Sequence, residues 1–266
     1  MKAPLPGMRG PGQRPDGYLV EDVLAMSQQP PSGTRVRGPL AEALVQLAGT
    51  PDDMPTIDAQ LRKLVQLLAD RVTGVDYASV TALRDDTYVT VATSSDLALA
   101  VDQAQYADND GPCLQSLQNQ TVVPVPDIAA TMTWPGFRKA AVKMGLHASV
   151  SIPLTTGSGA TVAALNLYGR DPGAMALLIA GLAVVCDPSR PLPPDTLPYG
   201  DDGREELLAG VAEALNVHAS IQRAMGVIMA EMHGSAADAY VKLRLKAADA
   251  GLSLPAAATM ITQQVA

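Results

Sequence analysis

The sequence predicts two folded parts in one chain: an α+β domain with an antiparallel sheet covered by helices and, after it, an all-α region. Between residues 56 and 187, short segments rich in β-branched residues alternate with segments of helical periodicity. A proline-rich segment follows, and the apolar stripes beyond it have helical spacing. With 266 residues, the chain is long enough for each part to bury a core of its own.

Shifts in composition divide the chain into four segments. We expect residues 1–55 to be a mostly disordered tail, because proline and glycine are dense there and too little apolar surface is present to offset the entropy of ordering. Two stretches of this tail, 18–26 and 40–47, have an apolar side and could form short helices. The remaining segments are the α+β domain (56–187), a semi-rigid linker (188–203) and the helical region (204–266).

The α+β domain has a definite order of elements. Ile57, Leu61 and Leu68 recur at helical spacing behind a threonine cap, and Gly74 ends that helix. The strands are predicted from clustered or alternating β-branched residues between turn-forming sequences. They are expected at 77–83, 88–92, 121–125, 147–154 and 161–168, and the further helices at 97–106, 113–117, 134–144 and 174–186.

Residues that start and stop helices predict three helices in the C-terminal region. The first is long, carries apolar residues three or four positions apart, and stops at Gly234. Ser235, with Asp238 three residues later, is typical of a capping box at the start of the second helix, which Gly251 closes. Ser253 is expected to cap the third helix.

The apolar stripe of the long helix approaches a coiled-coil repeat, and a coiled-coil seam requires a partner helix. We therefore expect a homodimer that forms through a parallel pair of long helices, with His218 in or beside the seam. The seam residues would be Leu208, Val211, Leu215, Ile221, Met225 and Ile228.

Three short patterns in the helical region carry a resemblance to a known family. They read Ile221-x-x-Ala224-x-Gly226-x-x-Met229, then Ala239-Tyr240-x-x-Leu243-Arg244, then Leu254-x-x-Ala257-Ala258. Together they resemble the ANTAR domain, the RNA-binding antiterminator output module of bacterial regulators. The resemblance implies a dimer that binds paired RNA hairpins in transcript leaders and stops a transcription terminator from forming. Where the family usually has an arginine and a lysine, this chain has His218 and Met225.

The α+β domain carries a second resemblance. Its segments are LALAVD from Leu97, Asp110-Gly111-Pro112-Cys113, Ser151-x-Pro153-Leu154, and Ala164-Leu165-Asn166-Leu167-Tyr168. They resemble the GAF domains of actinobacterial regulators with ANTAR outputs. The resemblance implies a sensory module that binds a small ligand or serves dimerisation. Candidates for lining a ligand pocket, each of which could instead be a core or rim residue, are Tyr106, Cys113, Trp134, Phe137 and His147.

RNA binding by this chain would depend on a local cluster of charge, because the formal net charge is −8. Lys242 and Lys246 share one helix face at i,i+4 spacing, and Arg223 joins them if the first two helices pack as in the family. The candidate RNA-binding residues are Arg223, Ala224, Gly226, Lys242, Arg244 and Lys246. The alternative hypothesis is a signalling adaptor whose ANTAR-like bundle dimerises or docks a protein without binding RNA.

Other chemistries have little support in the sequence. Cys113 and His147 come without a recognisable third group to orient them, so we expect no catalytic site. The three histidines lack zinc spacing, and neither a metal nor a cofactor is expected. Two cysteines cannot form a disulfide framework, no secretion signal is visible, and the apolar run 174–186 is too short to span a bilayer. We therefore expect a cytoplasmic protein without a membrane contact.

Overall fold

The computed structural model describes residues 37–187, 189 and 201–264, and the predicted α+β domain followed by helices is confirmed. The strands are β1 (Tyr77–Arg84), β2 (Thr87–Thr93), β3 (Val123–Val125), β4 (Ala148–Thr155) and β5 (Thr161–Gly169). The helices up to the linker are α2 (Pro39–Ala48), α3 (Ile57–Arg71), α4 (Asp96–Asp108), α5 (Pro112–Asn119), α6 (Pro135–Lys143) and α7 (Pro172–Cys186). The helices after the linker are α8 (Asp202–Met232), α9 (Ala236–Ala250) and α10 (Leu254–Gln263).

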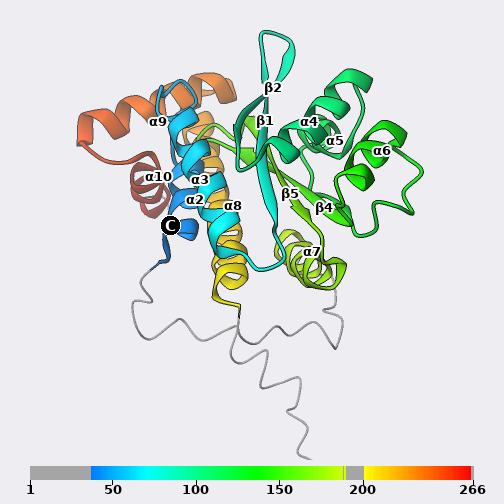
Figure 1. Ribbon diagram of the computed structural model, residues 1–266. Helices are drawn as coiled ribbons and strands as arrows, with labels where there is room; N and C mark the ends of the chain where they lie inside the picture. Colours follow the sequence, from blue (N-terminus) through cyan, green and yellow to red (C-terminus); the bar gives the residue numbers. More distant parts are fainter. Residues whose placement is uncertain (1–36, 188, 190–200, 265–266) are drawn as a thin grey trace, which may run out of the picture. The chain divides into compact units, whose positions relative to one another are not determined.

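The five strands form one antiparallel sheet in the order β2-β1-β5-β4-β3. Side chains alternate between the two faces along each strand, and the sequence assigns different chemistry to each face. Alanine, valine, leucine and isoleucine of β1, β4 and β5 join α2, α3, α7 and α8 in the main core. Serine, threonine and asparagine of the same strands are buried on the opposite face, next to α4 and α5 (Figure 1).

The C-terminal helices α8, α9 and α10 pack around a second core, and their predicted boundaries rest on local caps that the structure confirms. The Ser235 hydroxyl accepts a hydrogen bond from the backbone N–H of Asp238 at 3.2 Å, and the Asp238 carboxylate accepts one from the N–H of Ser235 at 3.2 Å. Gly251 ends α9 with a φ of 63°, a left-handed conformation that glycine adopts without steric cost. In the described part of the chain, no helix is both long and apolar enough to cross a membrane.

The folded part begins earlier than the predicted boundary at residue 56. Residues 39–48 form α2, as the apolar stretch 40–47 suggested, and Leu40, Leu44 and Leu47 are buried in the main core. Pro39 at the first helical position favours this start, because its missing N–H has no intrahelical partner there. The proline- and glycine-rich composition of residues 1–55 led us to place α2 in the tail, although its contacts with the main core stabilise it as part of the fold. The predicted helix at 18–26 lies outside the described residues.

The prediction that a second copy of α8 covers its apolar stripe is wrong for most of the stripe. Other helices of the same chain cover most of it, because α8 packs against α2 and α7 with its first half and against α9 and α10 with its second. The periodicity indicated a buried stripe without indicating which helix buries it. In the structure, Val211, Ile221, Met225 and Ile228 are buried, Leu208 packs at the edge of the main core, and Leu215 is 44% exposed.

Candidate functional site

The basic side chains of α9 lie on two different sides of the helix. Lys242 and Lys246 are four positions apart and share one side, whereas Arg244 is turned by about 200° from each of them. Both lysines are half-buried, and neither forms an ion pair with any residue that the structure describes. Their ammonium groups can therefore contact an external anion without first losing a partner.

Arg244 faces the loop between α2 and α3. Its Nη2 lies 3.0 Å from the carboxylate of Asp53, which belongs to the loop between α2 and α3. Its guanidinium also lies 5.9 Å from the centre of the Tyr240 ring, within range of a cation–π contact. The structure thus separates Arg244 from the two lysines with which sequence analysis grouped it.

The small residues predicted to contact RNA have opposite environments. Ala224 is fully buried between α8 and the other two C-terminal helices, so its assignment as an RNA contact is wrong. Its small side chain serves close helix packing instead. Gly226 and Arg223 are exposed on the other side of α8, and a side chain at Gly226 would meet nothing within 4 Å. These two residues are accessible to a partner.

These environments predict opposite effects of enlarging the two side chains. Ala224→Leu should lower the free energy of unfolding by about 1–3 kcal/mol, because extra methyl groups overpack a filled core. Gly226→Ala should raise it by about 0.5–1 kcal/mol, because alanine is the better helix former in open space. Chemical denaturation of both variants tests this. Equal stability of the two variants would contradict the packing described for Ala224.

Asp52 joins the sensory part to the C-terminal helices. Its carboxylate accepts hydrogen bonds from the Thr156 hydroxyl at 2.8 Å and the Ser158 N–H at 3.1 Å, in the turn between β4 and β5. It also accepts one from the Tyr240 hydroxyl of α9 at 3.4 Å. Burial, and next the charge of Asp52, raise the pKa of Tyr240 to about 12, so this phenol stays protonated and donates. Gln222 of α8 donates to the carbonyl of Ser158 at 2.8 Å in the same turn.

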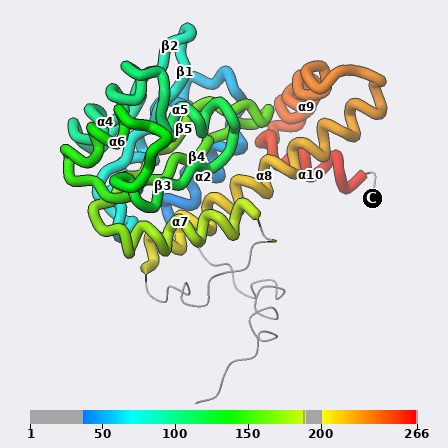
Figure 2. The backbone as a smooth tube through the Cα atoms, turned by 90° about the vertical axis from the view of Figure 1, so that its right-hand side faces the viewer, coloured from blue at the N-terminus to red at the C-terminus, as the bar shows by residue number. Residues whose placement is uncertain are grey.

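Helix α8 belongs to both cores (Figure 2). Its first half contributes Leu207 and Val211 to the main core, and its second half contributes Ile221 and Ile228 to the C-terminal core. A Cβ at Gly210 would lie 2.7 Å from the Cα of a residue of α2, so a glycine is needed for this close approach. A single helix of 31 residues therefore connects the two parts.

The polar face of the sheet carries a buried hydrogen-bond network centred on Asp102 of α4. The Asp102 carboxylate accepts hydrogen bonds from Tyr168 at 2.6 Å, Ser79 at 3.0 Å and Thr90 at 2.9 Å. Thr90 also lies 2.8 Å from the hydroxyl of Tyr106. Burial raises the pKa of Asp102 from 3.8 to about 6, and the three hydrogen bonds only partly oppose this shift.

The network extends across four strands, β1, β2, β4 and β5, and two helices. Asn166 of β5 donates to Ser79 at 3.2 Å and to Thr81 at 2.9 Å, and it accepts from Ser151 of β4 at 2.9 Å. Gln105 of α4 accepts a hydrogen bond from the backbone N–H of Cys113 at 3.0 Å. Sequence analysis missed most of these residues. The signal was present as hydroxyl residues two positions apart in β1 (Ser79, Thr81) and β4 (Ser149, Ser151), and as Asn166 and Tyr168 in β5.

The five predicted ligand-pocket residues do not surround one cavity. Tyr106 and Cys113 lie at the network around Asp102, and burial, followed by the charge of Asp102, raises the pKa of the Cys113 thiol well above its usual value. Trp134 and Phe137 pack edge to face in a third apolar cluster, with ring centres 6.4 Å apart. The side chain of His147 is exposed. None of the five lines the cavity of about 740 Å³ beside α2, α8, α9 and α10 or the cavity of about 310 Å³ beside α3 and β2.

The fold and these contacts define an α+β domain joined to a three-helix module through the long helix α8. Comparison with known families names both parts. Residues 55–177 match the family model of the GAF domain, and residues 209–261 match that of the ANTAR domain. The chain thus carries a GAF domain followed by an ANTAR domain, which indicates a sensory regulator with an RNA-binding output.

Solved structures resemble parts of the chain at low identity. A domain of a protein described as a two-component sensor histidine kinase from Sinorhizobium meliloti 1021 is 15% identical, with a TM-score of 0.38 over 64% of this chain and 93% of that one. The type II free methionine-R-sulfoxide reductase from Thermoplasma acidophilum is 12% identical, with a TM-score of 0.32 over 45% and 82%. No curated protein matches the chain.

Proposed function

We propose that this chain is a cytoplasmic, signal-responsive regulator that binds paired RNA hairpins in transcript leaders and prevents transcription termination, as in the actinobacterial GAF–ANTAR type. It acts as a homodimer and catalyses no reaction. The observation that carries the proposal is the uninterrupted helix α8, which is part of both cores. A change in packing within the GAF domain moves the first half of this helix and, with it, the base of the ANTAR module.

The RNA contacts in this proposal are Lys242, Lys246 and Arg223. The two lysines have no ion pair within the described residues, and Arg223 is exposed on α8. Cations that neutralise phosphates release the counterions of the nucleic acid, so they supply affinity even on an acidic protein when they are clustered. Arg244 is paired with Asp53 in the structure. It becomes a further RNA contact when α9 moves away from the loop between α2 and α3 and this ion pair breaks.

The experiment that tests the proposal is an electrophoretic mobility shift of the full chain with a paired-hairpin RNA at several salt concentrations. Phosphate contacts give an affinity that falls steeply as salt increases, with a slope set by the number of contacts. An RNA with both hairpins unpaired by sequence changes is the control. Binding that is absent at low salt, or indifferent to the hairpins, contradicts the proposed function.

Releasing Arg244 should strengthen RNA binding. Asp53→Asn removes the ion pair without changing the size of the side chain, and we expect hairpin affinity to rise about 2–4-fold, because an exposed ion pair holds its partner by about 1 kcal/mol or less. The matched control is Asp58→Asn, which removes the exposed pair of Asp58 with Arg84, at 2.8 Å, and changes the net charge equally. Equal effects of the two substitutions would mean that charge alone matters and that Asp53 does not restrain Arg244.

One observation favours the adaptor as a second candidate function. Val241 and Leu245 on the outer side of α9 are 55% and 59% exposed, and apolar side chains at such positions suit a protein partner better than RNA. In that case the hairpin RNA would cause no shift at any salt concentration. Replacing both residues by serine would then weaken self-association or partner binding, which sedimentation analysis of the full chain can detect.

A further inference from the structure

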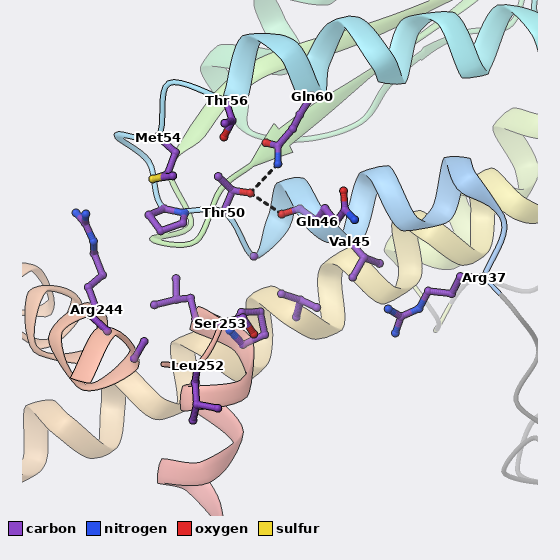
Figure 3. A pocket seen from close by; sticks show the side chains of 17 residues that line it. Arg37, Val45, Gln46, Thr50, Met54, Thr56, Gln60, Arg244, Leu252 and Ser253 are labelled. Carbon is purple, nitrogen blue, oxygen red and sulfur yellow. Dashed lines mark hydrogen bonds between the residues drawn. The ribbon is translucent and has the colours of Figure 1, made fainter. Parts of the chain in front are cut away.

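A cavity of about 740 Å³ lies where the sensory part meets the ANTAR helices (Figure 3). Three regions of the chain line it: the segment from Arg37 through α2 to the start of α3, the middle of α8, and the end of α9 with the start of α10. Its volume falls within the range of about 300–1,000 Å³ that small-molecule sites occupy. It is separate from the GAF residues that sequence analysis assigned to a ligand.

The walls of the cavity are mainly apolar. Val45 of α2, Val217 of α8 and Leu254 of α10 approach it from the three regions, and Met54 and Leu252 lie at its rim with exposed fractions of 41% and 40%. Large apolar side chains that remain this exposed around a concavity favour an apolar occupant, because its burial removes their surface from water.

The charged side chains that line the cavity are cationic, although the chain as a whole is acidic. Of the 17 described residues that line the cavity, the charged ones are Arg37 and Arg244, which lie at opposite ends in Figure 3. Arg37 uses Nε to pair with Glu213 at 2.7 Å, and Arg244 uses Nη2 to pair with Asp53 at 3.0 Å. A guanidinium has five N–H donors, so each arginine retains donors for a further anion.

From these two features we propose that the cavity between α2, α8, α9 and α10 binds a small amphipathic organic anion. The apolar body lies against Val217 and Leu254, and the anionic group binds Arg244. Arg244 is the assigned anion partner because its side chain is less exposed than that of Arg37, 37% against 53%, and water screens its charge less. The bound anion competes with Asp53 for Arg244 and holds the ANTAR helices against α2. This proposal goes beyond RNA binding and is tested without RNA.

The probe that tests the site is 8-anilinonaphthalene-1-sulfonate, which combines an apolar body, one anionic group and one N–H donor. N-phenyl-1-naphthylamine has the same body and donor without the charge. In fluorescence titrations of the full chain we expect one molecule of the anionic probe to bind each chain. Arg244→Gln should weaken its binding about tenfold and leave the uncharged probe unaffected.

Replacing each of two alanines of α9 by phenylalanine tests whether the probes bind in this cavity. Ala248 is exposed and lines the cavity, so Ala248→Phe should fill part of it and reduce the binding of both probes at least tenfold. Ala237 is exposed on the same helix outside the cavity, so Ala237→Phe should change neither. Far-ultraviolet circular dichroism shows whether each variant is folded. The proposal is overturned if folded Ala248→Phe binds the anionic probe as the parent does, or if Arg244→Gln weakens both probes equally.

Discussion

Replacing Lys242 and Lys246 together by alanine is expected to lower the affinity for hairpin RNA roughly 50-fold at 0.1 M salt. Each phosphate contact contributes about 0.7–0.9 to the slope of log affinity against log salt, so two lost contacts reduce the steepness of that slope by nearly two. At 0.1 M salt this change in slope corresponds to the roughly 50-fold loss of affinity. Stability should hardly change, because alanine is a good helix former and neither lysine forms an ion pair within the described residues.

The structure offers a matched control for this double substitution. Lys139 and Lys143 of α6 are likewise four residues apart, although they are more exposed than the two lysines of α9, and they lie in the GAF domain, away from α9. Replacing both by alanine removes the same charge, so any loss of affinity that comes from the overall field appears in both double variants. Mobility shifts over a salt series measure the slopes. The antitermination function loses its physical basis here if the α9 variant, folded and as associated as the parent, binds RNA equally well.

Local signals in the sequence predicted most of the helical region. The caps at Ser235 and Ser253 and the stop at Gly251 depend on residues within one helical turn, so the sequence alone determines them. The strands of the GAF domain were predicted for a similar reason, because alternation with period two is visible along a single segment.

Long-range packing could not be predicted in the same way. The stripe containing Ile221 and Ile228 indicates burial, but the same pattern suits a second copy of α8 or the neighbouring helices α9 and α10. The ion pair of Arg244 with Asp53 joins residues 191 positions apart, and no sequence spacing indicates it. The structure therefore differs from the predicted RNA surface in two ways: Arg244 is paired with Asp53 through a tertiary contact, and Ala224 is buried.

The network around Asp102 could be predicted from the sequence only in part. Polar residues at alternate positions of β1, β4 and β5 indicated a polar sheet face, and Asp102 was visible as a charged residue within an otherwise apolar stretch of α4. The sequence did not show that the carboxylate would be fully buried at the centre of that face. Only the packing of α4 on the sheet provides the hydroxyl groups that make its burial tolerable.

The titration of Asp102 is expected to make the folded chain less stable as pH rises from about 4 to about 6. The pKa of this carboxyl is 3.8 when unperturbed and about 6 in the fold, so the folded state holds a proton that the unfolded state has already released. Stability therefore falls with pH across this window and stays lower above it. A shift of about two pKa units corresponds to roughly 3 kcal/mol.

Asp102→Asn should remove this dependence, because an amide remains uncharged at every pH in the window. Tyr168 and Ser79 can still donate to its carbonyl oxygen, and the Thr90 hydroxyl can accept from its N–H group. We expect the variant to gain stability relative to the parent as pH rises, by roughly 2 kcal/mol between pH 4.5 and pH 7. Asp110→Asn, at an exposed loop position, is the control and should leave the pH dependence of the parent in place.

Urea unfolding of the three proteins at half-unit steps of pH measures the effect as a difference, which cancels the titration of the other carboxyl groups. Asp102→Ala distinguishes the charge from the hydrogen bonds, since it removes both and leaves the buried hydroxyls of Ser79 and Tyr168 without their acceptor. We expect it to be less stable than Asp102→Asn by about 2–4 kcal/mol at every pH. If Asp102→Asn has the same pH dependence as the parent, the buried carboxylate does not titrate in this window, and the GAF domain of this chain does not couple its stability to protons through Asp102.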